Sequence, residues 1–182
     1  TTYFWDVTDP AQIRKIDSIQ VDARTVNDVK VSEDGRISVI SREGASSRRN
    51  GIVIIDTTNP YDVNIISEYT TNLTGGVHNV FIYQDHVFAL SNGERFYVIN
   101  IEDPKNPYEV GMFEIGEKGQ AIHDVWIEDG IAYSSNWKHG VYIIDVGNGV
   151  AGGSPSNPVV MSNYSYESGA HHATFPFKSK ST

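Results

Sequence analysis

Short runs of apolar and β-branched residues, separated by turn residues, recur along this chain. The clearest stretch, 121–146, holds three such runs: Ile122–Ile127, Ile131–Asn136 and Gly140–Val146. An Asp-Gly pair or another polar-Gly pair lies at each break, which is the chemistry of tight hairpin turns. None of the runs shows the spacing of apolar positions that a helix requires. The pattern therefore predicts three consecutive antiparallel strands.

The same pattern returns along the chain at a nearly constant spacing. Four turns begin with an Asx residue, and these residues are 50, 44 and 45 positions apart: Asp6, Asp56, Asn100 and Asp145. A second anchor follows each turn, at spacings of 51, 45 and 48: Asn27-Asp28-Val29, His78-Asn79-Val80, His123-Asp124-Val125 and His171-His172-Ala173. Two independent anchors with a common period indicate an internal structural repeat.

Each period predicts four strands. The expected strands of the three complete units are Val26–Ser32, Arg36–Ser41, Gly51–Thr57 and Asn64–Thr70; Val77–Tyr83, His86–Asn92, Arg95–Ile101 and Glu109–Ile115; and Ala121–Glu128, Ile131–Asn136, Gly140–Val146 and Val159–Tyr166. Four antiparallel strands in about 45 residues match one blade of a β-propeller. Packing of each blade between two neighbours also explains runs that are apolar on both faces, such as Ile52–Ile55 and Val141–Ile144. The predicted fold is an all-β propeller fragment.

The whole chain, 1–182, is predicted to form one partial propeller domain with blades at about 26–70, 77–115 and 121–166. Partial blades are expected at both ends, over 1–21 and 171–182. Tyr3–Val7 and Arg14–Val21 would be the last two strands of an earlier blade, and His171–Phe177 the innermost strand of a further one. Unpaired blades predict either a longer parent chain or copies that complete one another by strand exchange.

Composition narrows the function classes. The formal net charge is −9, whereas nucleic-acid-binding surfaces are normally basic, so we expect no nucleic-acid partner. Cysteine is absent, which excludes thiol catalysis, disulfides and cysteine-ligated zinc. No apolar run approaches the length of a transmembrane helix, and no signal peptide is recognisable. The phosphate-binding, dinucleotide, nucleophile-elbow and zincin motifs are also missing, which leaves open whether the protein is an enzyme.

The histidines are the main candidates for chemistry. His78, His123 and His171 begin the expected innermost strands, which line the central channel of a propeller. Imidazoles around one axis could bind a divalent transition metal or a ligand, with His172 and Asp124 as further ligands or orienting groups. The alternative is structural, because a polar residue at the mouth of a buried strand can tie a loop to the next blade.

Two further groups of residues are assigned roles. Trp137 and His139 lie in a predicted hairpin loop and are candidates for a binding rim, since indole faces stack on sugar rings, although ordinary rim packing is the alternative. The Asx series is assigned to turns, because an Asx side chain accepts a bond from the backbone two residues on while Pro presets φ. This series consists of Asp6, Asp56, Asn100 and Asp145.

The units GIVIIDTTNP, RFYVINIEDPKNP and GVYIIDV resemble the LVIVD repeat, named for an apolar strand that ends in Asp. Asn100 and Asn27 depart from the pattern, where Asp and His are usual. The resemblance implies a bacterial or archaeal propeller, often exported or attached to the cell surface. We therefore expect a binding or scaffolding module of a larger extracellular, periplasmic or surface protein, with a protein or glycan ligand. The alternative function is a metal-dependent enzyme with a histidine cluster in the channel.

Overall fold

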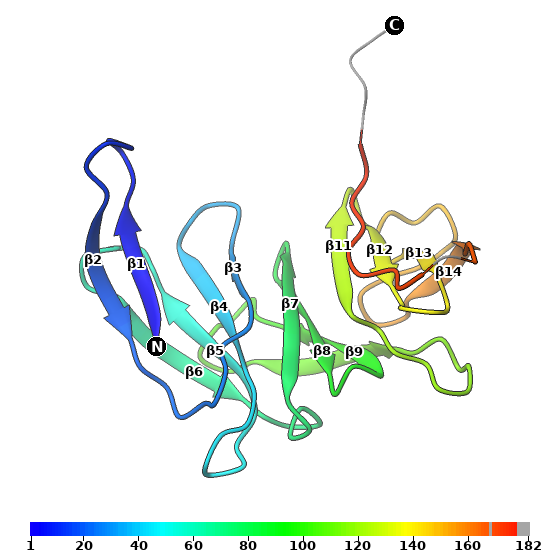
Figure 1. Ribbon diagram of the computed structural model, residues 1–182, viewed down its shortest axis with the longest axis horizontal. Helices are drawn as coiled ribbons and strands as arrows, with labels where there is room; N and C mark the ends of the chain where they lie inside the picture. The colour runs from blue at the N-terminus through cyan, green and yellow to red at the C-terminus, as the bar shows by residue number, and fades with distance from the viewer. Residues whose placement is uncertain (168, 178–182) are drawn as a thin grey trace, which may run out of the picture.

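The computed structural model describes residues 1–167 and 169–177, and strands and turns account for the regular structure in them. One two-stranded sheet and three four-stranded sheets follow one another along an arc (Figure 1). All pairings are antiparallel, and within each sheet every strand pairs with the strand next to it in sequence. We call the three larger sheets the first, second and third blades. The chain is thus all-β, as the repeat predicts.

The strands correspond closely to the repeat. The N-terminal pair is β1 (Thr2–Asp6) and β2 (Arg14–Ile19). The first blade consists of β3 (Val29–Val31), β4 (Ile37–Arg42), β5 (Gly51–Asp56) and β6 (Asn64–Tyr69). The second consists of β7 (Val77–Tyr83), β8 (His86–Ser91), β9 (Arg95–Asn100) and β10 (Tyr108–Phe113). The third consists of β11 (Asp124–Glu128), β12 (Ile131–Ser135), β13 (Val141–Asp145) and β14 (Val159–Tyr164).

The outer strand pair has the same irregularity in all four sheets. The register shifts between Phe4 and Trp5 in the N-terminal pair and between Ile54 and Ile55 in the first blade. Equivalent shifts occur in β10 of the second blade and at Ile143/Ile144 of the third. A bulge of this kind bends its strand and increases the local twist. Its recurrence shows that the repeat extends to backbone geometry.

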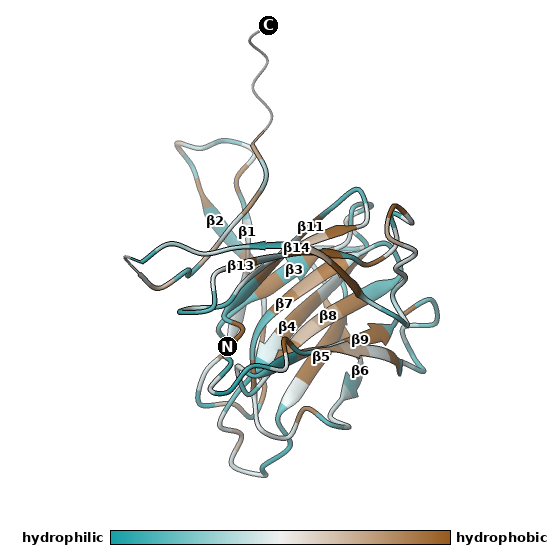
Figure 2. Ribbon diagram, turned by 90° about the vertical axis from the view of Figure 1, so that its right-hand side faces the viewer, coloured by the Kyte–Doolittle hydropathy of each residue, from teal (hydrophilic) through white to brown (hydrophobic). Residues whose placement is uncertain are grey.

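Apolar residues form a separate core between each pair of adjacent sheets, and Figure 2 shows the apolar strands of the first and second blades. Phe88 and Phe96 of the second blade pack with Val125 and Ile144 of the third. A second cluster joins the first and second blades, and a third joins the N-terminal pair to the first blade. Each fully buried aliphatic or aromatic side chain contributes about 1.5–3 kcal/mol, so the faces between blades hold the arc together.

The innermost strands β3, β7 and β11 lie next to one another, with β7 between the other two (Figure 1). They are shorter than expected in the first and third blades, where pairing begins only at Val29 and Asp124. The described residues contain no helix that is long and apolar enough to cross a membrane.

The segment His171–Phe177 does not form the expected strand. It makes one isolated antiparallel bridge, between His171 and Trp137 in the β12–β13 hairpin. It nevertheless lies along the third blade, because the Thr174 and Ser135 hydroxyls are 2.9 Å apart and the Phe175 ring contacts Trp126. Among the described residues, the segment has no strand with which to form a continuous ladder. The expected remainder of this partial blade, 178–182, lies outside the described residues.

Candidate functional site

Equivalent side chains of successive repeats meet in a row near the N-terminal ends of the innermost strands. The Asn27 amide nitrogen lies 3.0 Å from His78 Nδ1. The rings of His78 and His123 are 5.0 Å apart between centroids, and those of His123 and His172 are 3.8 Å apart. We call this series the histidine row: Asn27, His78, His123 and His172. The row follows the period of the repeat: Asn27 and His123 lie just before β3 and β11, His78 lies within β7, and His172 lies in the segment after the third blade.

The structure corrects the alignment of the two C-terminal histidines. The sequence places His171 in the series with His78 and His123, but His172 occupies that position. His171 is buried, its ring packs against Tyr166, and its Nδ1 lies 2.6 Å from the Trp137 carbonyl oxygen. The bridge at His171 directs its side chain away from the row, so the repeat spacing at this point is one residue longer than the sequence suggested. His171 fastens the segment to the hairpin.

The hydrogen bonds fix which ring nitrogens are available to a ligand. The Asn27 amide donates to Glu43 at 2.8 Å as well as to His78, so the neutral His78 ring accepts at Nδ1 and carries its proton on Nε2. His123 Nδ1 donates to the His172 carbonyl at 2.9 Å, so its Nε2 is an acceptor. Within the described chain neither Nε2 atom has a partner. The row thus offers one donor and one acceptor side by side.

Burial keeps the central imidazole neutral. Desolvation lowers the pKa of His123, and the neighbouring His172 and His78 lower it further, while its bond to the His172 carbonyl and the Asp124 charge oppose the shift. Glu43 lies 3.4 Å from His78 Nδ1 and would pair with that ring if it became protonated. At neutral pH, His123 Nε2 therefore keeps a free lone pair.

Trp137 completes the site from the β12–β13 hairpin. Its ring meets His123 nearly edge to face at 4.6 Å between centroids and His172 at 5.5 Å. The backbone of Trp137 has a φ of 43°, which lies in the left-handed region and is held by the two bonds it exchanges with His171. The candidate rim residue is therefore fixed against the candidate histidines, a contact that no spacing in the sequence could reveal.

A cleft of about 540 Å³ opens over His78, His123 and Trp137, and we call it the histidine cleft. Carboxylate and amide side chains provide half of the remaining lining residues: Glu43, Asn92, Glu94 and Gln120. Sequence reasoning missed these residues because they lie in loops that share no repeated motif. Asn27 is different, because it occupies the position at which the later repeats have His. Its place in the histidine row could therefore have been predicted from the sequence.

Two other candidates lie beside the cleft. His139 Nε2 is 3.3 Å from the Gly119 carbonyl oxygen, so this ring connects the hairpin to the loop before β11. Asp124 points to its own backbone, accepting from Val125 N–H at 2.8 Å, and burial raises its pKa. Across the described part of the chain, no group of three or more His, Asp or Glu side chains is placed to hold a metal ion. The row brings imidazoles together by stacking rather than around a shared centre.

The Asx series forms turns at the opposite end of the blades. Asp6, Asp56 and Asn100 each accept a bond from the backbone N–H two residues on, at 2.9–3.0 Å. Asp145 does the same for Gly147 and also accepts from three further backbone groups, Gly149, Ala151 and Gly153. These bonds lower the pKa of its carboxyl group despite burial, which acts in the other direction. The Gly/Ser-rich loop 147–157 is therefore wound around one carboxylate.

Comparison with known proteins supports the fold. No family model matches the chain, and no curated protein matches it by sequence. A crystal structure of a proposed 6-phosphogluconolactonase from Bacteroides uniformis is similar, with a TM-score of 0.70 over 91% of this chain and 11% identity. The chain spans about half of that protein, since 50% of its length is covered.

The repeated four-stranded sheets and this similarity define the chain as a β-propeller fragment, as the sequence predicts. At this level of identity, the similarity concerns the fold, so any activity must be argued from the residues of the chain itself.

Proposed function

We propose that this protein is a carbohydrate-binding propeller module and that the histidine cleft holds the saccharide. The observation that carries the proposal is a pair of ring nitrogens without partners among the described residues, the Nε2 donor of His78 and the Nε2 acceptor of His123, with the Trp137 ring against His123. A sugar hydroxyl group both donates and accepts, so it fits such a pair. The aromatic edge and face around the pair suit the C–H surface of a sugar ring.

The remaining lining supports the same ligand class. Carboxylate and amide side chains from Glu94, Asn92 and Gln120 add acceptors and donors without a net positive charge. Such a site discriminates against phosphorylated or strongly anionic ligands because the carboxylates would repel them. A cleft of about 540 Å³ is within the range of small-ligand sites.

The resemblance to the LVIVD repeat supports a second part of the proposal, that the module belongs to a protein that is exported or attached to the cell surface. Strands that end in Asp, such as β5 and β13, carry this resemblance. The complete coding sequence provides the test, since it should encode an export signal. A parent protein without one would contradict this part and leave the ligand proposal untouched.

Binding to an array of neutral mono- and oligosaccharides, followed by calorimetry on the best ligand, tests the main proposal. We expect Trp137→Ala to weaken binding roughly 10-fold or more, because it removes the aromatic wall. Lys138→Ala is the matched control, since this exposed neighbour in the same hairpin does not line the cleft. Lack of saccharide binding at millimolar concentration, or equal effects of the two variants, would overturn the proposal.

A further inference from the structure

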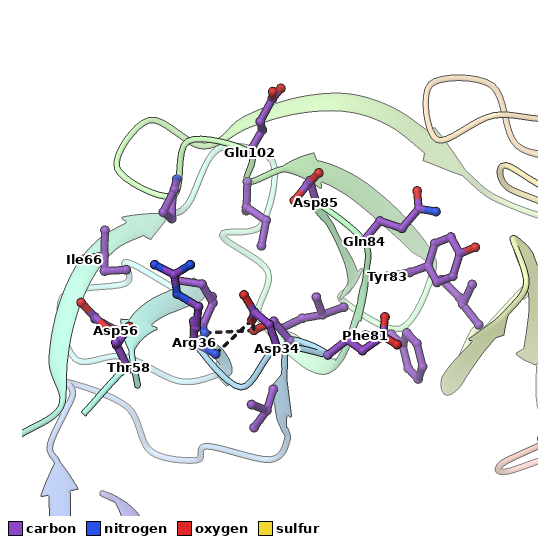
Figure 3. A pocket seen from close by; sticks show the side chains of 18 of the residues that line it. Asp34, Arg36, Asp56, Thr58, Ile66, Phe81, Tyr83, Gln84, Asp85 and Glu102 are labelled. Atoms are coloured by element: carbon purple, nitrogen blue, oxygen red, sulfur yellow. Dashed lines mark hydrogen bonds between the residues drawn. The ribbon is translucent and has the colours of Figure 1, made fainter. Parts of the chain in front are cut away.

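A larger hollow lies at the opposite end of the blades and is unrelated to the histidine row. It has a volume of about 950 Å³ and is bordered by the β3–β4, β7–β8 and β9–β10 turns, with a contribution from the β11–β12 turn (Figure 3). We call it the turn-end groove. Its apolar lining comes from neighbouring blades and includes Ile37, Ile66, Ile82 and Ile101. These side chains belong to or pack against the core between the first and second blades.

The rim of the turn-end groove is strongly acidic. It carries two cationic side chains, Arg36 and Lys105, and six carboxylates: Glu33, Asp34, Asp56, Asp85, Glu102 and Asp129. Hydrogen bonds from the Ser32 hydroxyl and the Arg36 N–H lower the pKa of Asp34, and the Thr58 N–H lowers that of Asp56; the charge of Arg36 adds a smaller contribution to both. The second-blade acids Asp85 and Glu102 instead lie near the His86 ring, whose pKa is lowered by burial and raised in part by their charges. In the described chain, the carboxylates of Asp85 and Glu102 form neither a hydrogen bond nor an ion pair.

The acids are too dispersed for a metal ion. They come from three blades, and no three acidic or histidine side chains among the described residues are grouped closely enough to hold a cation. Turn chemistry explains some of them, since Asp34 and Asp129 each precede a Gly in a hairpin turn. It does not explain Glu33 and Glu102. Separate negative charges around an apolar floor favour a ligand with separate positive charges joined by an apolar body.

We propose that the turn-end groove binds an aliphatic diamine or polyamine. Its methylene chain would lie over the isoleucine floor, while its ammonium groups would reach Asp85 and Glu102 on one side and Glu33 on the other. Burial of methylene groups supplies the attraction, and the carboxylates select for positive charge. The overall charge of −9 favours the approach of such a ligand from solution.

Calorimetric titration with spermidine and 1,5-diaminopentane tests this proposal, with ethylenediamine and magnesium chloride as comparisons at constant ionic strength. We expect spermidine to bind, and the two compounds with little apolar body to bind at least about 10-fold more weakly. The double variant Asp85→Asn/Glu102→Gln should weaken spermidine binding by about 10-fold, since each partly screened ion pair contributes a modest share. Glu117→Gln removes an exposed acid outside the groove and should change binding less than about 2-fold.

Three results would overturn the proposal. Magnesium or ethylenediamine binding as tight as spermidine would indicate only a diffuse counter-ion effect. Undiminished binding to the double variant, or equal loss in Glu117→Gln, would place the amine elsewhere. Trp137→Ala should leave spermidine binding unchanged, so failure here and failure of the saccharide proposal are distinguishable.

Discussion

The two ends of the blades use ionisable side chains in opposite ways. At the histidine end, imidazoles stack across the inner strands, and desolvation holds His123 in its neutral form. At the turn end, carboxylates remain charged because backbone N–H groups donate to them, as at Asp56 and Asp145. The first arrangement depends on contacts between blades, whereas the second depends on turns within one blade. One blade architecture thus places a cleft lined by imidazoles at one end and a groove with an acidic rim at the other.

The strongest test of this contrast is the removal of a turn carboxylate. Asp145→Ala removes a buried carboxylate that accepts from four backbone N–H groups of one loop, so we expect the melting temperature to fall by on the order of 5 °C or more. Asp56→Asn is the control, because Asp56 caps one N–H group and the second blade already uses Asn100 there. Its melting temperature should change by less than about 2 °C. Equal effects in calorimetric scans would mean that loop 147–157 does not depend on its carboxylate.

The pH dependence of stability gives the next largest difference between the histidine end and the turn end of the blades. The lowered pKa of His123 means that the unfolded chain binds more protons below the ordinary value of 6.5, so stability falls as the pH drops through that region. The lowered pKa of Asp56 gives a further loss only below its ordinary value of 3.8. Asp124 acts in the opposite direction. Because burial raises its pKa, its contribution to stability is present at low pH and is lost as the pH rises above 3.8.

Urea unfolding from pH 8 to pH 3 measures these losses. His123→Gln should flatten the loss between pH 7 and pH 5 and leave the loss below pH 4 in place, because the row loses its desolvated imidazole while the turns keep their carboxylates. If His123→Gln does not change the loss between pH 7 and pH 5, another group such as His86 is responsible for it.

The smallest expected effect concerns the border of the turn-end groove. Burial lowers the pKa of His86, and the charges of Asp85 and Glu102 partly offset that shift. Asp85→Asn/Glu102→Gln should therefore lower the pKa of His86 further, because both opposing charges are removed. Proton NMR titration of the imidazole measures it, with Glu117→Gln as the reference. A rise in the pKa would contradict the assigned electrostatics.

Much of the fold could be predicted because the blades repeat one local pattern. Strands such as β7 and β9 follow directly from β-branched and aromatic runs between turn residues, and the Asx turns follow from side chains that bond their own backbone. The strand predicted at His171–Phe177 was wrong: its composition suits a strand, but among the described residues it pairs only through the bridge between His171 and Trp137. The β-propensity of its residues favours an extended backbone, but a hydrogen-bonded ladder also requires a second strand.

The candidate site shows the same division. The sequence by itself determined that histidines would recur at the inner strands, because the period of the repeat places them there. Only the tertiary structure decided that His172 rather than His171 joins the row, that Trp137 closes against it, and that Glu43 and Gln120 share its cleft. These contacts join residues from different blades and loops. Local sequence fixes the shape of each blade, but the stacking of blades fixes which side chains meet between them.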